Sequence, residues 1–272
     1  MKKSVAVKFG LYSIIAFLVV LYLFPLFYVF NTSLKTEPEF IKNTMSLAKN
    51  LHFSNYADAW NQANFGGYIF NSLLYMTICT SLSMILAIFM AFPTARNYFK
   101  YTGLIYAAFL AGMFLPDGTI PQFRMLLTLG LYNTRTGYML GFITAGGVTF
   151  FMFVAYIKGI PKEFDEAAAI DGCGYFRYMF TILIPLMKPA ISSMAILQAL
   201  VVWNDIIRSI IYLSDDAILP MTRGLYAFTG SFNNTVTLQM AALIIVAAPI
   251  VTLYMFLQKY IIDGTLSGGV KG

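Results

Sequence analysis

The chain has 272 residues, of which 59% are hydrophobic and only 11% are charged, with a formal net charge of +6. A soluble globular domain carries about a quarter charged residues, so this composition excludes that class and indicates an integral membrane protein. The lysines and arginines are scattered among apolar runs without a dense basic cluster, which argues against a nucleic-acid partner.

The first predicted span covers residues 9–30 and follows a short charged start at 1–8. The apolar run is too long for a secretory signal, and no small-residue cleavage site follows it, so we expect a retained span. A polar loop with aromatic interruptions follows at 31–67. This loop could contact an extracytoplasmic partner or cap the helices, and the sequence favours neither.

Five further apolar runs predict spans at the length a bilayer requires. They cover residues 68–92, 102–115, 137–157, 190–213 and 237–262. Pro116-Asp117-Gly118 interrupts the second of these runs, and we expect that span to continue, bent, through 120–131. The sequence therefore predicts an all-α, polytopic membrane bundle of about six spans within residues 9–262, followed by a tail at 263–272.

The distribution of basic residues predicts the orientation of this bundle. With a cytoplasmic N-terminus, 11 of the 18 lysines and arginines lie inside and 7 outside, which agrees with the positive-inside rule. Both termini and the polar segment 158–189 then face the cytoplasm.

Few residues of this chain are suited to catalysis. Cys79 lies in an apolar run and Cys173 in a polar segment, so we expect no disulfide, and His52 is a loop residue with no ligand cluster around it. No nucleophile–base arrangement and no Gly-x-x-x-x-Gly-Lys phosphate loop are present in the sequence. We predict a non-enzymatic chain that binds no metal and no cofactor.

The most distinctive segment is the polar island at 158–189. Strong helix formers run up to Ile170, Gly172 ends that helix, and a second helix is predicted over 175–184 with Pro185 at its end. A helix–glycine–helix hairpin at a membrane surface is suited to being held by a protein outside the membrane.

The motif in this island resembles the EAA loop of importer permeases in the ATP-binding-cassette transporters. It reads Glu166-Ala167-Ala168, then Gly172, then Ile182-Leu183-Ile184-Pro185, with Ile184 where that family usually has leucine. Four more stretches are similar to carbohydrate-importing members: Leu129 to Thr134, Gly159 to Asp165, Trp203-Asn204-Asp205, and the tail Asp263 to Gly272. The Gly-Gly-Val-Lys-Gly ending resembles the second membrane subunit of maltose-type importers.

The resemblance implies a complex rather than an autonomous transporter. Its expected members are a second permease subunit, two ATPase subunits that bind ATP and magnesium, and an extracytoplasmic solute-binding protein for a sugar. The expected location is the inner membrane of a prokaryote. There are three alternatives. A permease for another solute is disfavoured by the tail, and an ion-coupled secondary transporter is disfavoured by the scarcity of acids within the spans. An intramembrane enzyme is disfavoured by the missing catalytic arrangement.

The resemblance also assigns roles to residues of the hairpin and of the tail. We expect Glu166 to accept a bidentate hydrogen bond from an ATPase arginine, while the small Ala167 and Ala168 let the hairpin enter a cleft. Gly172 supplies the backbone freedom of the turn, and Asp171 bonds either the turn or the partner. The tail residues Gly268, Gly269, Val270 and Lys271 are expected to contact the ATPase pair.

Two polar residues in the fifth predicted span are candidates for the sugar path. Asn204 and Asp205 interrupt an apolar run, where an ionisable residue is a functional candidate. The alternative, which we favour, is that Asp205 pairs with Arg208 three residues further along the same helix face.

Overall fold

The computed structural model describes the backbone of residues 2–228 and 235–269, and the side chains of 7–226, 228 and 235–255. Within these ranges the regular structure is helical, without strands. The α-helices are α1 Lys2–Ser33, α2 Glu37–Lys42, α3 Ser54–Gln62, α4 Phe65–Arg96, α5 Thr102–Gly112, α6 Thr119–Thr128, α7 Arg135–Leu140, α8 Gly147–Gly159, α9 Glu163–Ile170, α10 Tyr175–Tyr178, α11 Ile184–Leu186, α12 Lys188–Trp203, α13 Ile207–Tyr212 and α14 Val236–Gly269. A π-helix, η1, covers Met179–Leu183, and two 3₁₀ segments cover Asp216–Ile218 and Met221–Phe228.

The predicted apolar runs are helical, but they differ in length. In the part of the chain that is described, three helices are long and apolar enough to cross a membrane: Val7–Ser33, Phe65–Arg96 and Val236–Met255. The helical stretch Tyr175–Leu186 and α12 pass that test together but meet at a bend of 81°. The helices α5 and α8 are apolar and shorter, with 11 and 13 residues.

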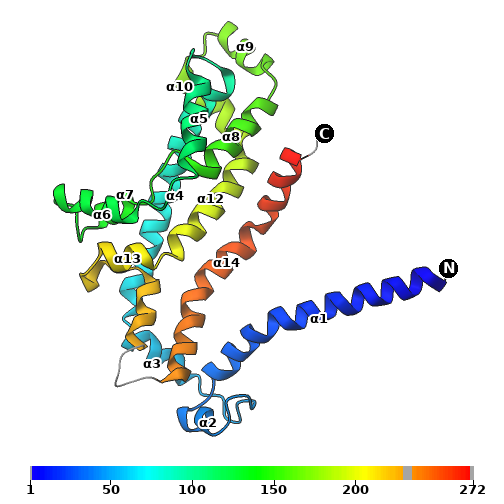
Figure 1. Ribbon diagram of the computed structural model, residues 1–272, viewed down its shortest axis with the longest axis vertical. Helices are drawn as coiled ribbons and strands as arrows, with labels where there is room; N and C mark the ends of the chain where they lie inside the picture. The colour runs from blue at the N-terminus through cyan, green and yellow to red at the C-terminus, as the bar shows by residue number, and fades with distance from the viewer. Residues whose placement is uncertain (1, 229–234, 270–272) are drawn as a thin grey trace. The chain divides into compact units, whose positions relative to one another are not determined.

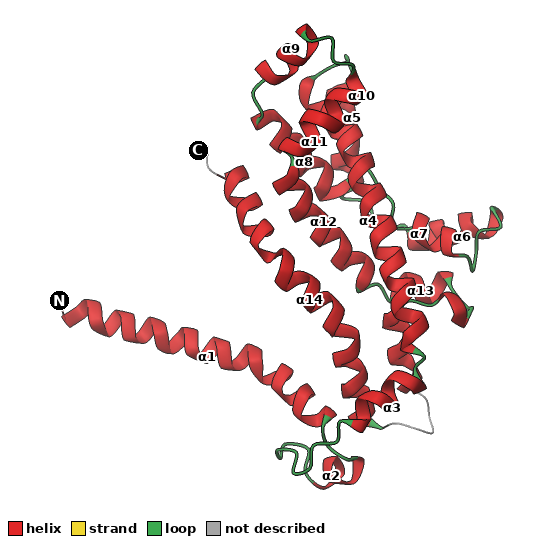
Figure 2. Cartoon of the chain, turned by 180° about the vertical axis from the view of Figure 1, so that it is seen from behind, coloured by secondary structure: helices red, strands yellow, loops and turns green. Residues whose placement is uncertain are grey.

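Three predicted elements are corrected by the structure. The bent continuation of the third span is wrong, because α5 ends at Gly112 and α6 starts afresh after the Pro116 break, running crosswise to α5 (Figures 1 and 2). The runs at 137–157 and 190–213 are each divided, into α7 and α8 and into α12 and α13. Hydropathy detects apolar character, whereas these breaks are interruptions of the backbone hydrogen-bond ladder.

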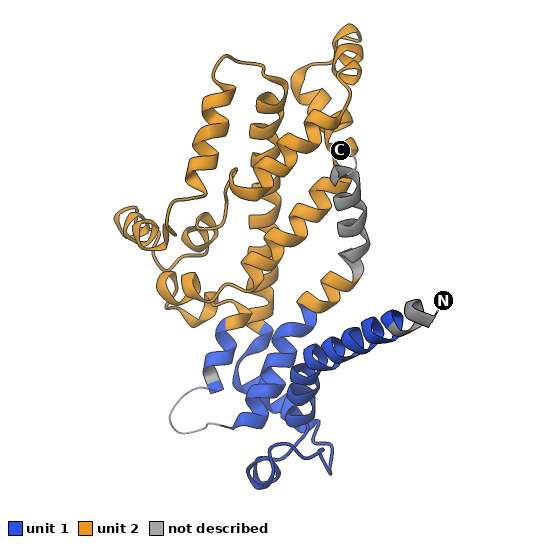
Figure 3. Ribbon diagram, turned by 45° about the vertical axis from the view of Figure 1, so that its right-hand side comes forward, with its two compact units in different colours: residues 1–66, 223–249 blue, residues 67–222, 250–272 orange. Residues whose placement is uncertain are grey.

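The chain forms two compact units (Figure 3), residues 1–66 with 223–249 and residues 67–222 with 250–272. In the first unit the outer loop is folded upon itself. The buried ammonium group of Lys35 donates to the carbonyl oxygens of Asn43 at 3.2 Å and Thr44 at 2.9 Å. The structure thus gives the 31–67 loop an internal packing role, and the contact with an extracytoplasmic partner remains a prediction.

The second unit contains the main core, built where α4, α8 and α12 pack together. Its fully buried side chains include Phe92, Phe150, Phe153, Met179 and Leu183. The helices α9 and α10 lie at one end of α4, α8 and α12, whereas α13 lies beyond the opposite end of α12 (Figure 1). The fold therefore separates the polar hairpin from the Asn204–Asp205 region along the length of the bundle.

Candidate functional site

The first helix of the hairpin ends as its sequence predicts. Gly172 adopts a φ of +66°, its N–H donates to the carbonyl of Ala169 at 3.1 Å, and the N–H of Cys173 donates to the carbonyl of Ala168 at 2.8 Å. These two bonds form a Schellman motif, in which a left-handed residue satisfies the last carbonyls of a helix. Glycine is suited to this position because a Cβ disfavours the left-handed conformation.

The second half of the hairpin differs from its prediction. Pro185 does not end the helix, which continues to Leu186 through the π-helix η1 and α11. The change of direction comes at Met187, between Pro185 and Pro189. Prolines lack the N–H needed for the helical ladder, and a π segment has an altered bond pattern, so both features explain the sharp bend.

The outer face of α9 is exposed and mixes charge with apolar surface. Glu163, Glu166 and Ala167 are exposed on this face, and Ile170 keeps 87% of its surface accessible. The acids of the first turn also complement the positive end of the helix dipole. An exposed isoleucine beside exposed carboxylates is a combination suited to a protein partner that supplies a cationic and partly apolar cleft.

Two residues that were predicted to bind the ATPase, Ala168 and Asp171, differ in burial or hydrogen bonding from the prediction. Ala168 is buried in the chain's own core, so its small size serves packing beneath α9, and its entry into a partner cleft remains a prediction. Asp171 is the exposed C-cap residue of α9, and among the described residues no hydrogen bond joins its carboxylate to the turn. Of the two alternatives expected for Asp171, the local bond to the turn is therefore not formed, and the contact with the partner remains a prediction.

An ion pair that the sequence analysis missed fixes the inner face of α9. The Nε atom of Arg96, at the end of α4, lies 2.6 Å from Oδ2 of Asp165. Arg96 also donates to the carbonyl of Ile160 at 3.1 Å, and the hydroxyl of Tyr178 donates to Asp165. The sequence shows an arginine directly after an apolar run, which marks Arg96 as a candidate but does not identify its partner.

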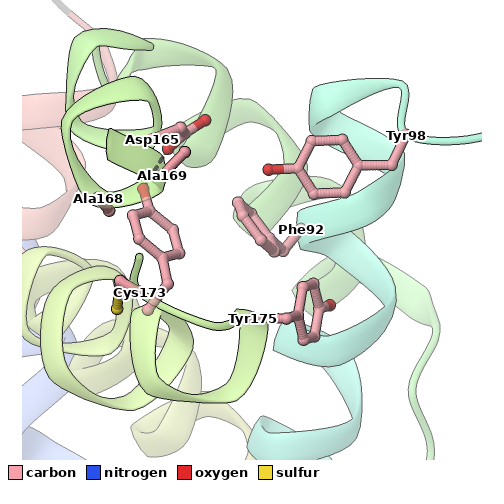
Figure 4. A pocket seen from close by; sticks show the side chains of 8 residues that line it. Phe92, Tyr98, Asp165, Ala168, Ala169, Cys173 and Tyr175 are labelled. Atoms are coloured by element: carbon pink, nitrogen blue, oxygen red, sulfur yellow. Dashed lines mark hydrogen bonds between the residues drawn. The ribbon is translucent and has the colours of Figure 1, made fainter. Parts of the chain in front are cut away.

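A pocket of about 130 Å³ opens beside this ion pair (Figure 4). Its wall is formed by the side chains of Phe92, Tyr98, Asp165, Ala168, Ala169, Cys173, Tyr175 and Tyr178. The hydroxyl of Tyr98 points into the pocket (Figure 4), and burial, aided by the charge of Asp165, raises the pKa of this tyrosine. The phenol is therefore uncharged at neutral pH, and the interior is lined by aromatic faces.

Beyond the far end of α12, the carboxylate of Asp205 is held by local hydrogen bonds, and its place on a sugar path remains a prediction. Its carboxylate accepts hydrogen bonds from the Tyr138 hydroxyl at 3.1 Å and from the backbone N–H of Ser209 at 3.0 Å. It also accepts the N–H of Arg208 at 3.4 Å, whereas the Arg208 guanidinium pairs with Asp117 at 3.6 Å. The expected side-chain pairing between Asp205 and Arg208 is thus replaced by capping of α13. Asn204 is exposed.

The Leu-Gly-Leu-Tyr-Asn-Thr stretch acts through Asn133. This residue has a φ of +55°, and its side-chain oxygen accepts the N–H groups of Ser214 at 2.8 Å and Asp215 at 2.9 Å. Its own N–H donates to the carbonyl of Tyr212 at 3.0 Å. The motif therefore fastens the end of α13 to the turn between α6 and α7.

The predicted tail contacts fall at the edge of what the structure describes. The helix α14 continues through Gly268 and Gly269, so the tail begins as helix rather than as an extended strand. Val270 and Lys271 lie outside the described residues.

Comparison with known proteins gives a consistent family. The family model of binding-protein-dependent transport system inner membrane components matches residues 16–266. The melibiose/raffinose/stachyose import permease protein MelC of Bacillus subtilis is 32% identical over 91% of both chains. The arabinooligosaccharides transport system permease protein AraQ of the same species is 31% identical over 93% of this chain and 92% of its own.

A solved structure agrees with the fold. One chain of a bacterial ABC transporter involved in the import of the acidic polysaccharide alginate superimposes with a TM-score of 0.85, at 20% identity, over 96% of this chain and 98% of its own. The apolar helices of the described residues agree with these matches. The chain belongs to the inner-membrane components of binding-protein-dependent transport systems.

Proposed function

We propose that this chain is one of two membrane subunits of an ATP-driven importer for an oligosaccharide or related sugar. The relatives named for melibiose, raffinose and stachyose, for arabinooligosaccharides and for diacetylchitobiose support the carbohydrate class. A permease for another solute class is the second candidate, and the Gly-Gly-Val-Lys-Gly ending favours the sugar. The subunit spans the inner membrane with both termini in the cytoplasm.

The outer face of α9 is the observation that carries the coupling role. It presents Glu166 next to the exposed Ile170, on a helix that Gly172 ends sharply. An arginine of the ATPase would bind the Glu166 carboxylate by two hydrogen bonds, while Ile170 enters an apolar part of the same cleft. The closure of the ATPase pair would then move the hairpin and, with it, the spans.

In the proposed complex, ATP hydrolysis and sugar delivery are carried out by other subunits. Two ATPase subunits bind ATP and magnesium, an extracytoplasmic protein delivers the sugar, and the second permease subunit completes the path. The purified chain alone is expected neither to bind nor to hydrolyse ATP. Specific ATP turnover in a preparation free of the partner ATPase would contradict this division.

The tail makes a second contact with the ATPases. Apart from Val270 and Lys271, the ending Gly268 to Gly272 carries no side-chain bulk, which allows a chain end to enter the narrow space between two subunits, where Lys271 would supply a charge contact. Deletion of residues 268–272 is expected to lower both transport and ATP turnover of the reconstituted complex. Wild-type values for both would assign the tail no role in coupling.

Uptake by cells tests the sugar class directly. A strain that lacks this chain would be supplied with labelled melibiose, raffinose, arabinooligosaccharides, an amino acid and a dipeptide. Uptake of one or more sugars should be lost and should return with the wild-type chain. Loss confined to the amino acid or the dipeptide would favour the second candidate.

A further inference from the structure

Two routes lead from the hairpin into the helices of the bundle. The first follows the chain through α10, η1 and α11 into α12. This route contains a π-helix, two prolines and the bend of 81° at Met187. Because of this bend, the covalent route is not one straight helix between the hairpin and α12.

The second route passes through space from α9 to α4. Arg96 is the last residue of α4, and its side chain is only 3% exposed. Its Nε and Nη2 atoms lie 2.6 Å and 3.3 Å from the two carboxylate oxygens of Asp165. Nη2 donates a hydrogen bond to one carboxylate oxygen, while Nε lies at ion-pair distance from the other, so the guanidinium contacts both oxygens of Asp165.

The same cluster includes both helices of the hairpin. Tyr178 in α10 donates its hydroxyl hydrogen to Asp165 in α9, and Arg96 also holds the carbonyl of Ile160, just before α9. The ends of α4, α9 and α10 therefore meet at one carboxylate.

Side-chain packing does not fill the space next to this carboxylate. The pocket of about 130 Å³ separates Ala169 of α9 from Phe92 and Tyr98 near the end of α4 (Figure 4). The Asp165 carboxylate lies on the wall of this pocket. The ion pair joins α9 to the end of α4 beside this pocket, and the buried Ala168 belongs to the same core cluster as Phe92.

We propose that Arg96, Asp165 and Tyr178 are positioning residues that carry movement of the hairpin into α4. The inference rests on the proposed docking of α9 with the ATPase. It assigns the cluster to the transmission of movement, and it leaves the binding of the ATPase to the opposite face of α9. Loss of the cluster should uncouple ATP hydrolysis from transport without releasing the ATPase.

The decisive variant is Arg96→Met combined with Asp165→Leu. Removing one partner alone would leave a buried charge, whereas an apolar pair of similar volume is often neutral for stability. Lys100→Met is the matched control, because Lys100 is an exposed cation four residues beyond Arg96. Tyr178→Phe removes only the hydroxyl and should shift the same measurements by a smaller amount.

Two measurements test the proposal on the full chain. In the complex purified with its own ATPase and second permease, the double variant should retain the ATPase but transport at least about fivefold less sugar per ATP hydrolysed. In the full-length subunit alone, the amides of α9 should exchange hydrogen faster while those of α8 stay unchanged. Unchanged transport per ATP in the double variant would overturn the proposal, as would unchanged exchange in α9.

A different experiment tests the proposed docking of α9 with the ATPase. Glu166→Lys reverses a charge on the outer face and should release the ATPase while leaving exchange in α9 of the isolated subunit unchanged. If Glu166→Lys retained the ATPase, docking through this face would be excluded, and the exchange result for Arg96 and Asp165 would still be informative about their contact.

Discussion

The carboxylate of Glu37 caps the last membrane helix at Thr237. Its Oε2 atom accepts hydrogen bonds from the hydroxyl of Thr237 at 3.1 Å and from its backbone N–H at 3.3 Å, and Oε1 accepts the N–H of Val236 at 3.4 Å. A negative charge at this position satisfies free N–H groups and complements the helix dipole. The outer loop thereby fixes the start of α14.

Replacing Glu37 with alanine should therefore loosen the first turn of α14. The expected cost is about 1 kcal/mol, the usual value of a helix cap. Hydrogen exchange of the amides that start α14 should become faster. Asp58→Ala, which removes an exposed carboxylate of α3 in the same loop, is the control and should leave that exchange unchanged.

The turn of the hairpin offers a comparison between two glycines. Gly172→Ala should destabilise the hairpin by about 1–2 kcal/mol, because its φ of +66° is unfavourable for an L-residue. Gly174→Ala should have little effect, since Gly174 has a φ of −67° and an added Cβ would meet open space. Exchange rates in α9 for the two variants check the difference, and equal rates would contradict the role of the turn.

Alanine variants of Asp205 and Asn204 should distinguish a loss of stability from a loss of sugar transport. Asp205→Ala removes the acceptor of the buried Tyr138 hydroxyl and of the α13 amides, with an expected cost of about 1–3 kcal/mol. The unfolding temperature of the purified subunit should fall. Asn204→Ala should leave that temperature unchanged, because Asn204 is exposed. A fall in sugar uptake for Asn204→Ala, at normal stability, would support its place on the path.

Sequence patterns were sufficient for the features that depend on local chemistry. The apolar runs coincide with helices, and the stop at Gly172 follows from the cost of a left-handed backbone. The crosswise α6 was missed because hydropathy does not report direction. The break after Trp203 was missed because an apolar run continues beyond Asp205, whose carboxylate starts a new helix.

The sequence did not predict the ion pair between Arg96 and Asp165, because the pair depends on how the helices pack. Arg96 and Asp165 are 69 positions apart, and only the packing of α4 beside α8 brings them together. The predicted topology puts the segment 158–189 in the cytoplasm, and residue 96, which follows the second predicted span, lies on the same side. Several other acids and bases share that side, however, and no pattern in the sequence selects one pair.

The most direct test of the central claim is the retention of the ATPase by Glu166→Lys. Reversing the charge removes the expected pair with arginine and adds repulsion, which together cost about 2–5 kcal/mol at an interface. Asp58→Lys makes the same change of charge on the outer loop and is the control. The account predicts that Glu166→Lys inserts normally but binds the ATPase at least about thirtyfold more weakly, while the control binds as the wild type does. Wild-type affinity and uptake for Glu166→Lys, at equal expression, would contradict docking through the outer face of α9.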